Sequence, residues 1–95
     1  MNSAASRRTV FVSNPHGLHC RPCLAIVNTV GEFQATVTVW KGDVTADASS
    51  ILQLMSLAAD QGTELSLTAE GPEAEEVLEA LVLSFTKEFD VLYAD

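Results

Sequence analysis

Hydrophobic and polar residues alternate with a period of two in three stretches of the chain: 33–40, 44–48 and 64–70. This alternation is the pattern of strands that are buried on one face only. The turn Lys41-Gly42-Asp43 lies between the first two stretches and predicts that they pair as an antiparallel hairpin. A further strand is predicted at 8–13, where a short apolar run ends in a loop.

Apolar residues recur at helical spacing in three other stretches. The first predicted helix covers residues 20–30 and stops at Gly31, and Ser49 or Ser50 can cap a short helix from Ile51 to about Ala59. A last helix is predicted to open with Pro72 in its first turn, and its apolar stripe consists of Ala74, Val77, Leu78, Leu81, Val82 and Phe85. The predicted order is βαββαβα. An antiparallel sheet with its helices on one face, in the α+β class, is the simplest arrangement that buries every apolar stripe.

The short helix carries more apolar side chains than one sheet face can bury. Ile51, Leu52, Leu54 and Met55 point to nearly every side of it, so we expect part of this set to form an exposed apolar patch of the kind used for protein contacts. Trp40 falls on the strand face opposite the core and is expected to be exposed, as an interaction anchor or as a lid over polar neighbours.

Length and charge restrict the class of protein. The 95 residues predict one domain, with tails at 1–7 and 90–95. The net charge of −8 argues against nucleic acid or an anionic membrane as partner, because both require clustered cations. No apolar run approaches the ~20 residues of a membrane span. Two closely spaced cysteines do not make a secreted disulfide framework, so a reducing, cytoplasmic location is expected.

The candidate chemistry lies in Gly17-Leu18-His19-Cys20-Arg21-Pro22-Cys23, where a loop leads into the first helix. Backbone N–H groups and the positive end of the helix dipole favour an anion at that point. Imidazole titrates near neutrality and is a competent nucleophile, so His19 is a candidate acceptor of a phosphoryl group. Arg21 is a permanently charged donor that can bind phosphoryl oxygens.

The two thiols allow other interpretations. Cys20 and Cys23 spell Cys-x-Pro-Cys at a helix start, a pattern typical of thiol–disulfide redox proteins. The second half of the chain predicts no parallel crossover unit, which argues against that fold. The alternative is that both thiols are small residues packed at the helix start. No metal site is predicted, because no second ligand pair follows and His16 and His19 alone would make an improvised one.

Ser50 also has two possible roles. It can be only a helix cap, or it can be a regulatory phosphorylation site.

Residues 17–22 resemble the active-site signature of HPr, the histidine-containing phosphocarrier of the bacterial phosphoenolpyruvate:sugar phosphotransferase system. Residues 49–57 look like the regulatory-serine helix of that family, and Gln61-Gly62 followed by Thr68-Ala69-Glu70-Gly71 is similar to its closing strand. The resemblance covers roughly residues 8–89. It implies an open-faced β-sandwich, with a four-stranded antiparallel sheet and three helices on one face.

The resemblance also implies a role for each site residue. His19 is the expected phosphoryl acceptor, Arg21 its supporting cation and Ser50 the counterpart of the serine that a dedicated kinase phosphorylates in some bacteria. Ile51, Leu52 and Met55 would lie on the docking surface for partner proteins.

The partners that the resemblance implies are a phosphoenolpyruvate-dependent first enzyme as donor, and transporter or regulatory domains as acceptors. The protein would be a carrier without a cofactor and without turnover of its own. Cys20, Cys23 and Ser49 depart from the usual family pattern. Gly71-Pro72-Glu73 and Phe89-Asp90 look somewhat like the nitrogen-related branch, so a nitrogen-type regulatory carrier is an alternative, as is a redox protein that uses both cysteines.

Overall fold

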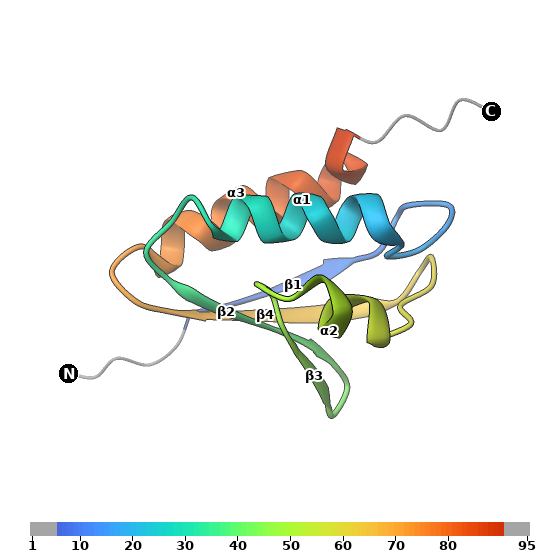
Figure 1. Cartoon of the computed structure of the whole chain (residues 1–95), viewed down its shortest axis with the longest axis horizontal. Helices are drawn as coiled ribbons and strands as arrows, with labels where there is room; N and C mark the ends of the chain where they lie inside the picture. Colours follow the sequence, from blue (N-terminus) through green and yellow to red (C-terminus); the bar gives the residue numbers. More distant parts are fainter. Residues whose placement is uncertain (1–5, 91–95) are drawn as a thin grey trace.

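A four-stranded antiparallel sheet with strand order β1-β4-β2-β3 forms the base of the molecule (Figure 1). The structure is a computed structural model and describes residues 6–90. The α+β class and the order βαββαβα are confirmed, and a single further turn, η1, follows the last helix. The elements are β1 (Ser6–Phe11), α1 (Cys20–Val30), β2 (Thr36–Lys41), β3 (Val44–Asp47), α2 (Ile51–Ser56), β4 (Glu64–Glu70), α3 (Ala74–Thr86) and η1 (Glu88–Asp90).

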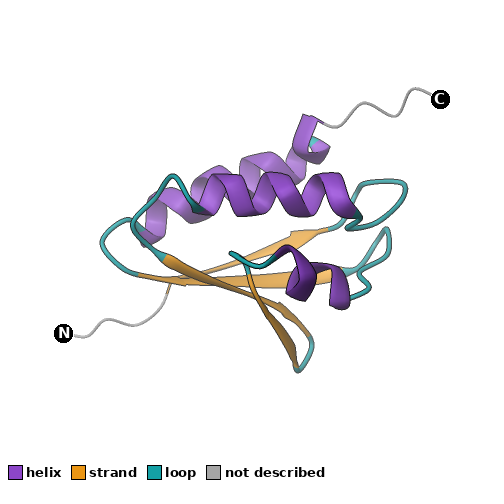
Figure 2. Cartoon of the chain, in the orientation of Figure 1, coloured by secondary structure: helices purple, strands orange, loops and turns teal. Residues whose placement is uncertain are grey.

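The register of the sheet explains which residues enter the core. Leu67 of β4 lies opposite Val39 of β2, and Leu65 lies opposite Val10 of β1, so these side chains share one face. All four are buried, and α1 and α3 cover this face while the other face stays open (Figure 2). α2 packs against α1 and β3 and adds the fully buried Leu54 to the same core. Burial of this single apolar face provides most of the driving force for folding.

Two strands have boundaries that differ from those predicted. β1 covers 6–11 rather than 8–13, and β2 begins at Thr36 rather than at 33. The second difference has a local cause, because the Gln34 N–H donates to Glu73 Oε1 at 2.7 Å and the Gln34 carbonyl accepts from the Glu73 N–H at 3.1 Å. The chain before β2 is therefore bonded to the start of α3 instead of to the sheet.

Two helices also differ at their ends. α2 ends at Ser56 and not near Ala59, since Ala58 takes a positive φ of 51° that an α-helix cannot contain. The prediction that Pro72 lies in the first turn of the last helix is wrong: Glu73 is the N-cap and Ala74 the first helical residue. Pro72 belongs to the preceding turn, while Glu75 and Glu76 occupy the first helical turn, where negative charge is favourable.

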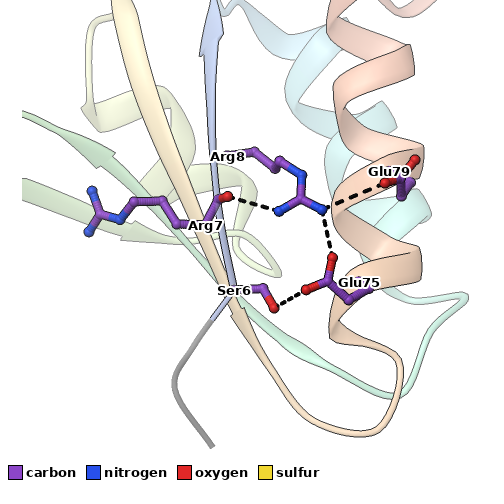
Figure 3. A network of polar contacts seen from close by, with 5 residues as sticks. All are labelled: Ser6, Arg7, Arg8, Glu75 and Glu79. Carbon is purple, nitrogen blue, oxygen red and sulfur yellow. Dashed lines mark hydrogen bonds and ion pairs between the residues drawn. The ribbon is translucent and has the colours of Figure 1, made fainter.

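One edge of the sheet is joined to α3 by a network of polar contacts (Figure 3). Arg8 points toward α3, where its Nη2 lies 2.6 Å from Glu75 Oε1 and 3.6 Å from Glu79 Oε2. The Ser6 hydroxyl donates to the other Glu75 oxygen. The hydrogen bond from Ser6, and to a smaller extent the contact with Arg8, hold the pKa of Glu75 below its ordinary value. Since the side chains are partly or largely exposed to solvent, the network is expected to contribute only a little to the stability of the fold.

Trp40 lies on the open face of the sheet, as predicted, but it is half-buried rather than exposed. Its indole N–H donates to Thr68 Oγ1 at 3.0 Å, and the Arg7 guanidinium lies 5.9 Å from the ring centroid. Trp40 thus covers polar neighbours, which favours the second of the two roles considered for it.

The tails expected at 1–7 and 90–95 fall mostly outside the described residues, and Ser6 and Arg7 belong to β1. Across residues 6–90, no helix combines the length and apolar character that crossing a membrane would require.

Candidate functional site

His19 is the N-cap of α1, as its place in the sequence predicts. Its backbone is extended, with φ −86° and ψ −168°, and its carbonyl accepts the first helical hydrogen bond, from the Cys23 N–H at 3.2 Å. The imidazole is half-buried and therefore accessible to a partner. The first turn of α1 contains no acidic residue that would compete with an anion for the positive helix end.

The loop before His19 is fixed to the loop after α2, and the two lie side by side at one end of the molecule (Figure 2). The Leu18 N–H donates to the Ala59 carbonyl at 2.9 Å. Gly17 has φ +71°, and a Cβ at this position would lie 2.5 Å from the same Ala59 oxygen. Only glycine permits this approach, so Gly17 sets the distance between the two loops.

Asn14 lies within the loop before His19 and holds it by hydrogen bonds. The sequence pattern did not single out this residue. It is the one polar residue among those described that is fully enclosed, at 0% exposure. Its side-chain Nδ2 donates to the Glu88 backbone carbonyl at 3.1 Å, and its backbone carbonyl accepts from the Gly17 N–H at 3.0 Å. The pattern of the sequence places Asn14 in a turn, and its burial follows from η1, a contact partner 74 positions away.

Arg21 is exposed on the first turn of α1, two residues after His19. The ring of His16 is exposed in the preceding turn, and its centroid lies 5.8 Å from that of His19. The structure therefore gathers two imidazoles and one guanidinium at the same helix end. Among residues 6–90, no group of three or more histidines, cysteines or carboxylates could hold a metal ion.

The two thiols have different environments. Cys20 is exposed, whereas Cys23 is fully buried and its Sγ donates to the Leu18 carbonyl at 3.6 Å. Burial, with a smaller contribution from Cys20, raises the pKa of Cys23 to about 11. The interpretation of packed small residues thus describes Cys23 but not Cys20.

Ser50 is the N-cap of α2, so the predicted capping role falls on it and not on Ser49. Its Oγ accepts from the Gln53 N–H at 3.2 Å, and Gln53 Oε1 in turn accepts from the Asp47 N–H at 2.9 Å. Ser49 instead donates its hydroxyl to Asp47 Oδ1 at 2.7 Å, which lowers the pKa of Asp47.

The expected apolar patch on α2 is present. Leu52 is 82% exposed and Met55 43%, Ile51 is half-buried, and only Leu54 turns fully into the core. α1 packs against α2 and adds Leu24, which is 44% exposed. We call Leu24, Ile51, Leu52 and Met55 the docking surface, after the role that we propose for them.

The two helices that carry the docking surface contain few charged residues. α1 and α2 together carry one charged residue, Arg21, and all 13 acidic residues lie elsewhere in the sequence. Lys41, one of five cations in the chain, binds the carbonyls at the end of α2, with Nζ 2.9 Å from Leu57 O and 3.3 Å from Ala58 O. α1 and α2 thus carry little charge in an otherwise acidic molecule, although Asp60 lies beside Gly17, with its Cα 3.1 Å from where a Cβ at Gly17 would be.

An accessible imidazole at a helix N-terminus, beside an arginine and an apolar surface, is a site suited to carrying a phosphoryl group between proteins. Residues 6–87 match the family described as the PTS HPr component phosphorylation site. The chain belongs to this family and is a phosphocarrier of the phosphotransferase system.

Several of its relatives are phosphocarrier proteins that it matches over almost their whole length. The chain is 34% identical to the phosphocarrier protein HPr of Treponema pallidum, over 87% of this chain and 94% of that one. It is 32% identical to the phosphocarrier protein NPr of Proteus mirabilis, over 87% and 93%. A crystal structure of HPr-C-His from Thermoanaerobacter tengcongensis superposes with a TM-score of 0.86 at 34% identity, covering 92% of this chain and 98% of that one.

Proposed function

We propose that His19 is the residue that carries the phosphoryl group. A ring nitrogen attacks the phosphorus of the phosphorylated donor, the P–N bond forms as the donor's bond to phosphorus breaks, and a second transfer to an acceptor restores the free imidazole. The observation that carries this assignment is the place of His19 as N-cap of α1, where the helix dipole and first-turn N–H groups favour the three phosphoryl oxygens. No cofactor takes part, and the protein is a carrier without turnover of its own.

Arg21 supports the same step as a cation. It lies one turn or less from His19, is exposed, and keeps its charge at every physiological pH. A guanidinium at this distance offsets the charge that the phosphoryl group brings to the site, and its side chain is long enough to follow the group when it is transferred.

The docking surface is proposed to bind both donor and acceptors. Leu52 and Met55 expose apolar area that a partner can cover, and they lie on the helix whose following loop is bonded to Leu18. The donor in this proposal is the phosphoenolpyruvate-dependent first enzyme, and the acceptors are transporter domains or, in the nitrogen-type alternative, regulatory domains. This exchange takes place in the cytoplasm, where protein thiols are mostly reduced and disulfides form only transiently.

Phosphorylation of Ser50 is the proposed regulation. Ser50 directly precedes Ile51 and Leu52, so a phosphate there would place about two negative charges at the border of the apolar surface. A serine kinase of the HPr family would be the modifying partner. Docking, rather than the fold of α2, is the step that we expect the modification to weaken.

The proposal is tested by incubating the protein with phosphoenolpyruvate and the general first enzyme, followed by intact mass measurement. One acid-labile phosphoryl group is expected on the wild type and on His16→Ala, and none on His19→Ala. Equal labelling of the wild type and His19→Ala would refute the assignment. Arg21→Ala should keep the label but acquire it more slowly, since it removes a supporting charge and not the acceptor.

A further inference from the structure

Cys20 and Cys23 lie at the first and fourth residues of α1, one turn apart on the same side of the helix. Residues at this spacing have Cβ atoms about 5–6 Å apart, whereas a disulfide requires about 4 Å. The first turn of a helix is its most adaptable part. Its carbonyl groups accept helical hydrogen bonds, but its N–H groups have no partner within the helix. A disulfide is therefore within reach if this turn tightens.

The two thiols differ in a way that suits sequential attack. Cys20 is exposed and can meet an oxidant in solution, while Cys23 is enclosed at 0% exposure and is shielded from it. A solvent-facing thiol followed one turn later by a buried one is the arrangement in which the first forms a mixed disulfide and the second resolves it.

We propose that Cys20 and Cys23 form a reversible disulfide that suppresses phosphoryl transfer at His19. The oxidant is a small disulfide of the glutathione class. The Cys20 thiolate attacks one of its sulfurs and releases one thiolate, and Cys23, losing its proton, then attacks Cys20 and releases the second. Two electrons pass from the protein thiols to the oxidant, which leaves as two thiols. The suppression depends on the proposed function of His19, whereas the disulfide itself does not.

His19 lies directly between the two positions that the disulfide would move. On one side, Leu18 accepts a hydrogen bond from Cys23 Sγ at 3.6 Å, and the oxidised sulfur has no proton to donate. On the other side, Cys20 would be drawn inward toward Cys23. The His19 carbonyl itself accepts from the Cys23 N–H. A tightened first turn therefore changes the orientation of the imidazole relative to the phosphoryl group of a bound partner. Displacements of about 1 Å at a reacting group can lower the rate as much as a hundredfold.

The disulfide is tested on the full-length protein with oxidised glutathione, without any partner. The wild type should lose about 2 Da, two hydrogens, and after unfolding in denaturant neither cysteine should react with an alkylating agent until dithiothreitol is added. Cys20→Ser should show neither change, and Cys23→Ala should stop at a mixed disulfide on Cys20. A wild type that keeps two alkylatable thiols, or stays as a mixed disulfide, overturns the proposal.

The effect on His19 is tested after removal of the oxidant, with phosphoenolpyruvate and untreated first enzyme. Oxidised wild type should be phosphorylated about tenfold more slowly than the reduced form. The double variant Cys20→Ser, Cys23→Ala, carried through the same treatment, should show no change. Equal rates for oxidised and reduced wild type overturn the suppression. If the reduced wild type takes no label, the assignment of His19 is what fails, and the disulfide is still decided by the mass measurement.

Discussion

The Leu18 N–H donates to the Ala59 carbonyl at 2.9 Å, so the residue before His19 is bonded directly to the loop that follows α2. Lys41 binds two carbonyls of the same loop, at Leu57 and Ala58. Hydrogen bonds thus connect the loop before His19 with the loop that follows the helix of the docking surface. A change in either loop should alter both the position of His19 and the surface that a partner covers.

Gly17→Ala should disturb this arrangement. The added Cβ would lie 2.5 Å from Ala59 O, and a positive φ of +71° is unfavourable for alanine. Because the contact is with backbone, the two loops must separate, and we expect a loss of about 2–3 kcal/mol in the free energy of unfolding together with slower phosphorylation of His19. Urea unfolding and the initial rate of labelling measure the two effects.

The matched control is Gly42→Ala. Gly42 has a similar φ of +60°, but its Cβ would meet nothing within 4 Å. This variant therefore carries the backbone strain without the collision, and should lose about 1 kcal/mol with no change in labelling rate. If the two variants behaved alike, the close approach of the loops would not be what Gly17 provides.

Leu52→Ala and Leu54→Ala separate docking from folding on one helix. Leu52 is 82% exposed and Leu54 is fully buried. Leu54→Ala should cost about 2–5 kcal/mol of stability, because it leaves a cavity in the core. Leu52→Ala should leave the urea midpoint nearly unchanged and raise the KM of the first enzyme for this carrier.

A chemical donor gives the decisive comparison for Leu52. Phosphoramidate phosphorylates imidazole without any protein partner, so His19 of Leu52→Ala should react with it at the wild-type rate. An equal slowing with phosphoramidate and with the first enzyme would mean that Leu52 acts on His19 and not on docking.

Much of the fold was predictable because its signals are local. Strand alternation, helical spacing and the glycine turns each depend on residues within one element, and β4 and α1 have the predicted bounds. Some of the errors occur where a distant residue competes for the backbone. Gln34 is bonded to Glu73 instead of to the sheet, and η1 has no periodicity from which to predict it.

In the site, too, the local features could be predicted from the sequence and the contacts between distant residues could not. The position of His19 follows from a loop, a proline and a helical pattern that lie together in the sequence. The contacts of Asn14 with Glu88 and of Lys41 with Leu57 join residues that are 74 and 16 positions apart, and no sequence pattern links them. The burial of Trp40 was missed for the same reason, because Thr68 and Arg7 reach it from two other strands.

Glu75→Gln should destabilise the protein at neutral pH and not in acid. Contacts with Ser6 and Arg8 depress the pKa of Glu75 from its ordinary value of 4.5, so the folded state holds this carboxyl ionised more firmly than the unfolded state does. Its contribution is fully present above the unfolded pKa and is lost as pH falls through the lower folded pKa. The urea midpoints of wild type and variant should therefore differ at about pH 7, and the difference should shrink as pH falls below the ordinary glutamate pKa of 4.5.

Glu76→Gln is the control for this prediction. Glu76 also lies in the first turn of α3, so its substitution removes the same charge from the same helix end without touching Arg8. High salt should narrow the Glu75 difference, since the contacts are exposed and screened. A pH-independent difference would show that the charge of Glu75 is not what the network uses.

Ser50→Asp and Ser50→Ala should separate the two roles of this serine. Alanine removes the hydroxyl that accepts from Gln53 N–H and should cost about 1 kcal/mol, with little effect on labelling of His19 by the first enzyme. Aspartate can still cap the helix but adds a charge beside Ile51 and Leu52, so it should keep stability and slow labelling several-fold. Ser56→Asp places the same charge at the other end of α2 and controls for net charge. Slower labelling in Ser50→Ala than in Ser50→Asp would mean that α2 must be capped for transfer, and that a charge at Ser50 does not govern docking.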